Sequence, residues 1–132
     1  MEFPLSFGLQ KAGLPLIISG THNLCFLIDT GATHNVIFNY VYEHFKKEFK
    51  RLDGNQSIMG IEGIYQETPI IEATFNFEGV DYTSSFSVLE ASDAMQQVQK
   101  ETGIQIHGIL GVQFLLENKW ILDFKKLTIT VK

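Results

Sequence analysis

The stretch Phe26-Leu27-Ile28-Asp29-Thr30-Gly31-Ala32 places one acidic residue at the end of an apolar run. Residues 24–28 are apolar throughout, and a strand without polar alternation is typical of one that is covered on both faces. An ionised carboxylate shielded from water is costly unless hydrogen bonds compensate it. We therefore expect local groups to hold Asp29: the hydroxyl of Thr30, and backbone N–H groups that Gly31 allows to turn toward the carboxylate.

An Asx turn that only closes a strand would use the same tripeptide, so Asp-Thr-Gly alone does not establish a site. Two further segments bear on the choice. Ile109-Leu110-Gly111 ends a second apolar strand, and the stretch from Ser57 to Tyr65 contains Gly60 and Gly63, as a flexible hairpin does. Each also has a plain structural interpretation, namely a buried strand that ends at a turn and an ordinary hairpin.

Together these three segments resemble the retropepsin-type aspartic proteases, the single-domain family that includes the retroviral proteases. Residues 27–32 match the catalytic loop of that family, with Ala32 where Ser or Ala is usual. Residues 109–111 match its apolar-apolar-Gly strand, which passes beside the loop and precedes a short helix, here residues 112–117. Residues 57–65 lie where the family has its flap hairpin, and the resemblance covers nearly the whole chain.

The resemblance implies a mainly β fold, a closed or partly open barrel-like sheet with two short helices, as one domain over residues 1–132. It implies an aspartic endopeptidase that needs no cofactor and no metal ion. Catalytic roles fall to Asp29, Thr30 and Gly31. The residues expected to bind a peptide or protein substrate are Ala32, Gly60, Ile61, Gly63, Ile109 and Leu110. Met59 and Tyr65 are expected to be packing residues instead.

Hydrolysis through an activated water needs a base and an acid, and the sequence has one Asp-Thr-Gly loop. The resemblance implies a homodimer in which Asp29 of each copy meets across a two-fold axis and the pair shares one proton. Val112-Gln113, in place of the Arg-Asn or Arg-Asp usual in viral members, resembles the bacterial and cellular branches. The alternative is a non-catalytic module of the same fold that binds peptides or a protein.

Composition restricts the partners. The net charge of −5 disfavours nucleic acid, and the longest apolar runs, such as residues 24–28, fall far short of the roughly 20 residues of a membrane-spanning helix. The N-terminal Met1-Glu2-Phe3-Pro4 lacks the basic start of a secretory signal, which predicts a cytoplasmic location. The single Cys25 is interpreted as a buried, inert thiol, and the four histidines lack metal-binding spacing.

Periodicity predicts the remaining elements. Helices are expected over residues 39–51 and 91–102, the second ended by Gly103. Alternating apolar residues predict a hairpin that turns at Glu78-Gly79. Further strands are expected at residues 3–9, 14–19 and 24–28, with a turn at 20–23, and at 120–124 and 127–131, with a turn at 125–126.

Overall fold

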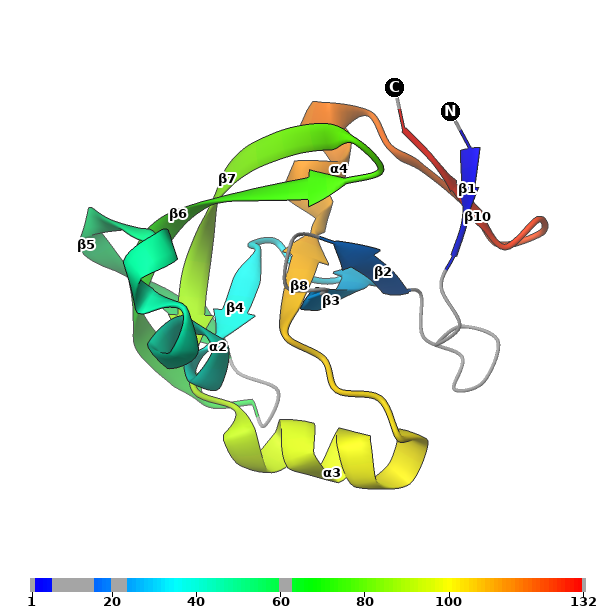
Figure 1. Cartoon of the computed structure of the whole chain (residues 1–132). Coiled ribbons are helices and arrows are strands. Elements are labelled where there is room, and N and C mark those ends of the chain that lie inside the picture. Colours follow the sequence, from blue (N-terminus) through cyan, green and yellow to red (C-terminus); the bar gives the residue numbers. More distant parts are fainter. Residues whose placement is uncertain (1, 6–15, 20–23, 60–62, 132) are drawn as a thin grey trace.

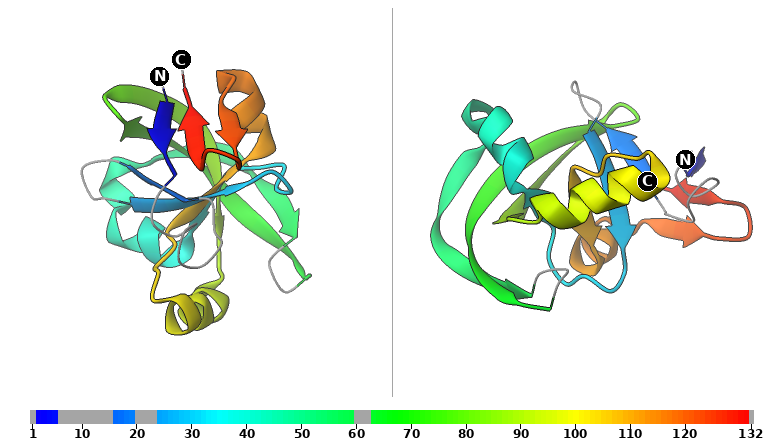
Figure 2. Two further views of the ribbon diagram at one scale, coloured as in Figure 1. Left: turned by 90° about the vertical axis from the view of Figure 1, so that its right-hand side faces the viewer. Right: turned by 90° about the horizontal axis from the view of Figure 1, so that it is seen from below.

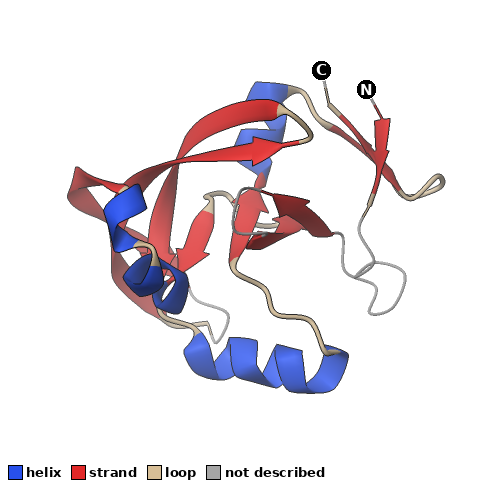
Figure 3. Ribbon diagram, viewed as in Figure 1, coloured by secondary structure: helices blue, strands red, loops and turns tan. Residues whose placement is uncertain are grey.

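The computed structural model describes residues 2–5, 16–19, 24–59 and 63–131 of the chain. Strands dominate these residues, with short helices between them (Figure 3). The strands are β1 (Glu2–Pro4), β2 (Leu16–Ser19), β3 (Leu24–Asp29), β4 (Val36–Phe38), β5 (Lys50–Met59), β6 (Tyr65–Phe77), β7 (Val80–Leu89), β8 (Gly108–Gly111), β9 (Ile121–Asp123) and β10 (Thr128–Thr130). The helices are α2 (Asn39–His44), α3 (Ser92–Thr102) and α4 (Val112–Asn118), with a 3₁₀ turn, η1 (Lys46–Glu48).

The strands form two sheets (Figure 1). One has seven strands in the order β2-β3-β8-β4-β7-β6-β5, and the other has three in the order β1-β10-β9. In the described ranges β2 and β5 remain edges of the larger sheet, so that sheet is curved but does not close. The expected mainly β, partly open architecture is confirmed. Because β1 pairs with β10, the two ends of the chain lie side by side (Figure 2).

Strand β3 lies inside the larger sheet, antiparallel to β2 and parallel to β8. Phe26 and Ile28 belong to one buried cluster, whereas Cys25 and Leu27 pack with another. The strand therefore separates two apolar layers, which explains why its sequence lacks polar alternation. Both layers hold the strand rigidly up to Asp29, its last residue.

Strands β6 and β7 form the predicted hairpin. Ile71, Ala73, Phe75 and Phe77 are buried, and the residues between them are exposed. The turn at Glu78-Gly79 has positive φ at both positions, 52° and 84°, as a tight two-residue hairpin turn requires. The period-two pattern thus predicted both the pairing and the buried face.

The helix expected over residues 39–51 is shorter than predicted. Helix α2 ends at His44, the turn η1 follows, and β5 already begins at Lys50. Lys50 and Arg51 pair with Glu72 and Ile71 of β6. This sheet pairing overrides the helical spacing of the apolar residues. It joins segments about 20 residues apart, and local periodicity cannot predict a contact over that separation.

The helix over residues 92–102 agrees closely with the prediction, since Gly103 has a φ of 75° and donates its N–H to the carbonyl of Gln99 at 2.7 Å. Helix α4 is a third helix beyond the two of the predicted fold class, and it corresponds to the one that the resemblance implies after Gly111. None of the helices within the described residues is long and apolar enough to cross a membrane.

Two glycines let β8 run between β3 and β4. A Cβ at Gly108 would lie 2.6 Å from the carbonyl oxygen of Val36 and 2.9 Å from the Phe26 ring. A Cβ at Gly111 would lie 2.8 Å from the carbonyl oxygens of both Ala32 and His34. Real Cβ atoms do not approach other atoms this closely, so the packing of the sheet requires glycine at both positions.

His107, just before β8, joins the ends of neighbouring strands. Its backbone N–H donates to the carbonyl of Cys25 at 2.9 Å, and its own carbonyl accepts from the N–H of Phe38 at 3.1 Å. Its ring Nδ1 accepts a hydrogen bond from the N–H of Cys25 at 2.9 Å. A ring nitrogen that accepts is unprotonated, so the imidazole is neutral in this arrangement. Burial lowers the pKa of His107 below 6.5.

Protonation of His107 is expected to destabilise the fold. The folded pKa is lowered, so the unfolded chain binds more protons between that value and 6.5. The contribution of the neutral His107 ring to the free energy of unfolding is therefore fully present above pH 6.5, and it is lost as the pH falls through the pKa of the folded state. His107→Asn, whose amide oxygen can accept the same bond without titrating, should weaken this dependence in urea unfolding at several pH values. His44→Asn, at an exposed position, is the control, and equal acid sensitivity of the wild type and His107→Asn would contradict the prediction.

Candidate active site

Asp29 lies at the C-terminal end of β3, opposite Gly111 in the parallel register, and its side chain is half-buried. Its Oδ1 accepts a hydrogen bond from the N–H of Gly31 at 2.9 Å. A Cβ on Gly31 would lie 3.3 Å from that oxygen, so glycine permits the close approach of the loop to the carboxylate. This hydrogen bond is typical of an Asx turn that closes a strand, and it is also what a loop that holds a catalytic carboxylate would make. The bond by itself therefore does not distinguish a structural turn from a catalytic loop.

Thr30 is exposed at the tip of this loop. The loop continues with a bond from the Ala32 N–H to the carbonyl of Asp29 at 3.1 Å, and it is closed by a bond from the Val112 N–H to the carbonyl of Ala32 at 2.7 Å. The start of α4 thus anchors the segment that carries Asp29. The β3–β8 register confirms that residues 109–111 pass beside the loop.

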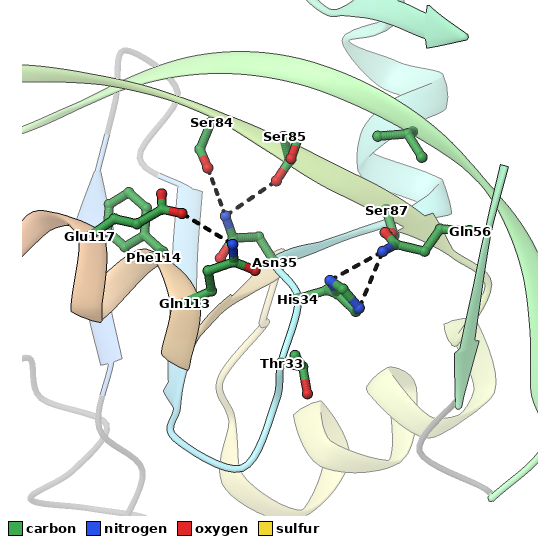
Figure 4. A pocket seen from close by; sticks show the side chains of 11 residues that line it. Thr33, His34, Asn35, Gln56, Ser84, Ser85, Ser87, Gln113, Phe114 and Glu117 are labelled. Atoms are coloured by element: carbon green, nitrogen blue, oxygen red, sulfur yellow. Dashed lines mark hydrogen bonds between the residues drawn. The ribbon is translucent and has the colours of Figure 1, made fainter. Parts of the chain in front are cut away.

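Asn35 fixes the far end of the loop, and sequence reasoning did not single it out. Its buried side chain accepts the N–H of Gly111 at 2.9 Å and donates to Ser84 Oγ at 3.0 Å and to the carbonyl of Ser85 at 3.2 Å (Figure 4). Its carbonyl accepts the N–H of Ser87 at 3.0 Å. One amide therefore connects the Asp29 loop to β7 and β8, yet nothing local in the sequence distinguishes it from an ordinary polar loop residue.

A cleft of about 470 Å³ opens beside Asp29. One side is the loop itself, and the other is the β5–β6 hairpin, so the cleft lies between the two segments that the sequence pattern emphasised. Buried apolar residues of β4, β7 and β8 line its inner wall. Its lining residues are Asp29, Gly31, Ala32, Thr33, His34, Val36, Ser57, Ile58, Met59, Tyr65, Leu89 and Ile109.

Of the expected substrate-binding residues, Ala32 and Ile109 line this cleft. Leu110 does not: it is fully buried in the core, because neighbouring residues of a strand point to opposite faces. Gly63 is exposed in the hairpin turn with a φ of 81° and is not among the cleft-lining residues. Gly60 and Ile61 lie outside the described residues.

Met59 and Tyr65 were expected to be packing residues, and the structure corrects this. They are 55% and 65% exposed and line the cleft. Their strands pair directly with each other at this point, Met59 opposite Tyr65. The described end of the hairpin leaves these side chains at the rim of the cleft.

A second, polar cavity of about 250 Å³ lies next to the cleft, and Figure 4 shows the residues that line it. His34 belongs to both hollows. Gln56 of β5 approaches the ring, with its Nε2 at 3.2 Å from Nδ1 and 3.1 Å from Nε2. Gln56 is itself held by Ser87 Oγ, which donates to Oε1 at 2.7 Å, and by Thr68 Oγ1, which donates to its carbonyl at 3.0 Å.

Neither Cys25 nor Tyr40 is among the residues that line this cleft. Burial raises the pKa of Cys25 to about 11, which agrees with the interpretation of an inert thiol. Burial also raises the pKa of Tyr40 to about 12. Across the described ranges, no group of three or more His, Cys, Asp and Glu side chains is placed to hold a metal ion.

Comparison with known proteins places the fold. No family model matches the chain, and no curated protein sequence matches it. Among solved structures, the retroviral protease-like domain of Ddi1 from Leishmania major is 14% identical, with 90% of this chain and 86% of that chain covered and a TM-score of 0.56. EIAV protease in complex with an inhibitor is 23% identical, with 85% of this chain and 92% of that chain covered and a TM-score of 0.58. The chain therefore has a retropepsin-like fold.

Proposed function

We propose that the protein is an aspartic endopeptidase that acts as a homodimer. The observation that carries the proposal is the position of Asp29: at the end of a rigid strand, held by the N–H of Gly31, and open to a cleft beneath a hairpin. The similarity of the fold to a solved protease and to a protease-like domain supports it. Val112-Gln113 after Gly111, where viral members usually have Arg-Asn or Arg-Asp, favours the bacterial and cellular branches over the viral one.

The chemistry requires two carboxyl groups, and the chain has one Asp-Thr-Gly loop. A second copy supplies the other Asp29 across a two-fold axis, with a water molecule between the two side chains. The ionised carboxylate takes a proton from the water as the water oxygen attacks the peptide carbonyl carbon, and the protonated partner donates its proton to the carbonyl oxygen. The carboxyl group that took the water proton then donates it to the amide nitrogen, while the other carboxylate takes a hydroxyl proton from the tetrahedral intermediate, so that the C–N bond breaks and a carboxylic acid and an amine are released. The exposed position of Thr30 leaves its hydroxyl accessible to the partner.

The β5–β6 hairpin acts as the flap over an extended peptide. Met59 and Tyr65 at its described end present apolar surface to the cleft, and Ile109 presents it from the inner wall. A peptide in such a cleft is held mainly through its backbone, as an added strand would be, with side-chain pockets that add selectivity. Gly31 and Ala32 form the floor beneath the scissile bond.

The same Asx-type contact at Asp29 also suits a module that binds peptides without cleaving them. Sedimentation combined with a peptide-library assay separates the two functions. For the protease we expect a reversible dimer, cleavage whose specific rate falls as the protein is diluted below its dimer dissociation constant, and inhibition by a pepstatin-like compound. A protein that is monomeric at every concentration would exclude the proposed protease. Peptide binding by a dimer without cleavage would support the binding module.

A further inference from the structure

The base of the β5–β6 hairpin contains a bulge, on the strand that forms one edge of the larger sheet (Figure 1). The register of β5 against β6 shifts between Arg51 and Asn55, so that residues 52–54 lie opposite the single residue Ile70. Pro69, the neighbour of Ile70, has no N–H and cannot donate a hydrogen bond to either adjacent strand. A bulge bends the strand that carries it and increases its twist. The hairpin therefore bends at this point.

The pairing of the sheet also changes at the bulge. Strand β6 pairs with β7 only as far as Ile70, because Val88 and Leu89 of β7 pair with β4 instead. Within the described residues, 55–59 and 65–69 pair with each other and with no other strand, and we call these two segments the arm. The residues of the arm that line the candidate cleft are Ser57, Ile58, Met59 and Tyr65. The direction in which the arm leaves the sheet therefore sets the position of this wall of the cleft.

Arg51, the single arginine of the sequence, holds the bulge through its guanidinium group. Its Nη1 donates to the carbonyl of Leu52, to that of Gly54 at 3.1 Å and to that of Ile70 at 3.2 Å. Its Nη2 donates to Oδ1 of Asn55 at 3.2 Å. One side chain thus joins both ends of the bulge to the residue opposite it. A planar guanidinium group offers several donors in a fixed geometry, which the ammonium group of lysine does not.

Two glutamines of the arm contact the body of the sheet from the side. Gln66 donates through Nε2 to the carbonyl of Glu90 at 3.0 Å, and its Oε1 accepts the N–H of Glu90 at 3.3 Å. Gln56 accepts from Ser87 Oγ at 2.7 Å. These bonds hold the arm beside β7, whereas the bend at its base is held by Arg51.

We propose that Arg51 is a positioning residue for the candidate cleft. Its guanidinium group fixes the bulge, and thereby the angle at which the arm stands over a bound peptide. An arm that is already in place lowers the ordering cost that peptide binding would otherwise include. Without the guanidinium group the bulge gains other conformations, and the arm samples positions that bind the peptide less well. This inference rests on the proposed function to the extent that a peptide occupies the cleft beneath the hairpin.

Backbone amide hydrogen exchange tests whether Arg51 acts locally. Arg51→Met keeps an unbranched side chain but has no donor, and we expect the amides of the arm to exchange about 10-fold faster in it, the size of one hydrogen bond. The amides of residues 72–77, in the same strand but paired with β7, should keep their rates. Arg51→Lys, which retains the charge without the planar donor set, should recover only part of the protection. Lys50→Met, at the neighbouring exposed position of β5, is the matched control and should leave the exchange of the arm unchanged.

Peptide kinetics measure the consequence for the cleft. For Arg51→Met we expect KM to rise by about 10-fold and kcat to fall by a smaller factor, because Arg51 acts through the arm and does not contact the reacting atoms. Peptide binding to Asp29→Asn protein, measured by fluorescence anisotropy with and without Arg51→Met, should weaken by the same factor. Binding that depends on Arg51, without any cleavage by the wild type, would overturn the protease function and retain the role of Arg51.

The exchange and binding measurements together can also contradict the role of Arg51. Equal exchange of the arm in the wild type and Arg51→Met would overturn it, and so would an equal increase in the arm and in residues 72–77, which is the sign of a general loss of stability. Faster exchange of the arm with unchanged KM and unchanged binding would overturn it as well. Aggregation of Arg51→Met with unchanged exchange would assign Arg51 to protection of the β5 edge instead. A wild type that neither binds nor cleaves any peptide would overturn both the protease function and this role.

Discussion

Replacement of Asp29 by Asn is expected to abolish peptide hydrolysis while the protein stays folded. Asparagine has the same shape and can accept the Gly31 N–H through its amide oxygen, so the loop keeps its hydrogen bond. It cannot take a proton from water, and kcat/KM should fall by roughly 10²–10⁴-fold, the range of a general acid–base group. Peptide cleavage and thermal melting of the same preparations measure the two effects.

The control is Asp93→Asn, at an exposed position in the first turn of α3, which should leave activity unchanged and lower the unfolding free energy by at most about 1 kcal/mol through the lost helix-dipole interaction. Mixing experiments extend the test to the dimer. If Asp29→Asn and wild-type chains exchange freely at equal concentrations, roughly half of the wild-type chains pair with an inactive partner, and wild-type activity should fall accordingly. Undiminished activity in chains shown to exchange would mean that one chain holds a complete site, which contradicts the shared dyad.

Gly108→Ala is expected to destabilise the fold strongly. The new methyl group would meet the Val36 carbonyl oxygen at 2.6 Å and the Phe26 ring at 2.9 Å, in a strand paired on both sides. Relief requires β8 to move away from β3 or β4, and overpacking of this kind costs about 3 kcal/mol. That loss is a large fraction of the roughly 5–15 kcal/mol that stabilises a typical domain. Urea unfolding monitored by the fluorescence of the single Trp120 measures the change.

Gly54→Ala is the matched control for this substitution. Gly54 has a φ of 85°, and no atom lies within 4 Å of the place that a methyl group would take, so alanine there meets backbone strain but no steric contact. We expect it to lose about 1 kcal/mol of unfolding free energy. Gly108→Ala with a loss no larger than that of Gly54→Ala would show that β8 accommodates the methyl group, contrary to the packing argument.

Local chemistry was enough to predict several elements. The alternation before and after Glu78-Gly79 predicted the hairpin, because a two-residue turn with positive φ and one buried face leave few alternatives. Gly103 predicted the end of α3 because glycine adopts the left-handed conformation without strain. The apolar run of β3 predicted a strand that is covered on both faces, because a strand with one exposed face would alternate apolar and polar residues.

What the sequence determined by itself was therefore the strand-rich class and the position of an acidic loop at the end of a buried strand, since both follow from neighbours along the chain. The tertiary structure alone decided which side chains reach the cleft. Ile109 lines it and Leu110 is buried because the pairing of β8 with β3 and β4 sets which face each residue occupies. The contacts of Asn35 and His34 likewise join residues from 22 to 76 positions apart, and separations of that length leave no periodic trace in the sequence.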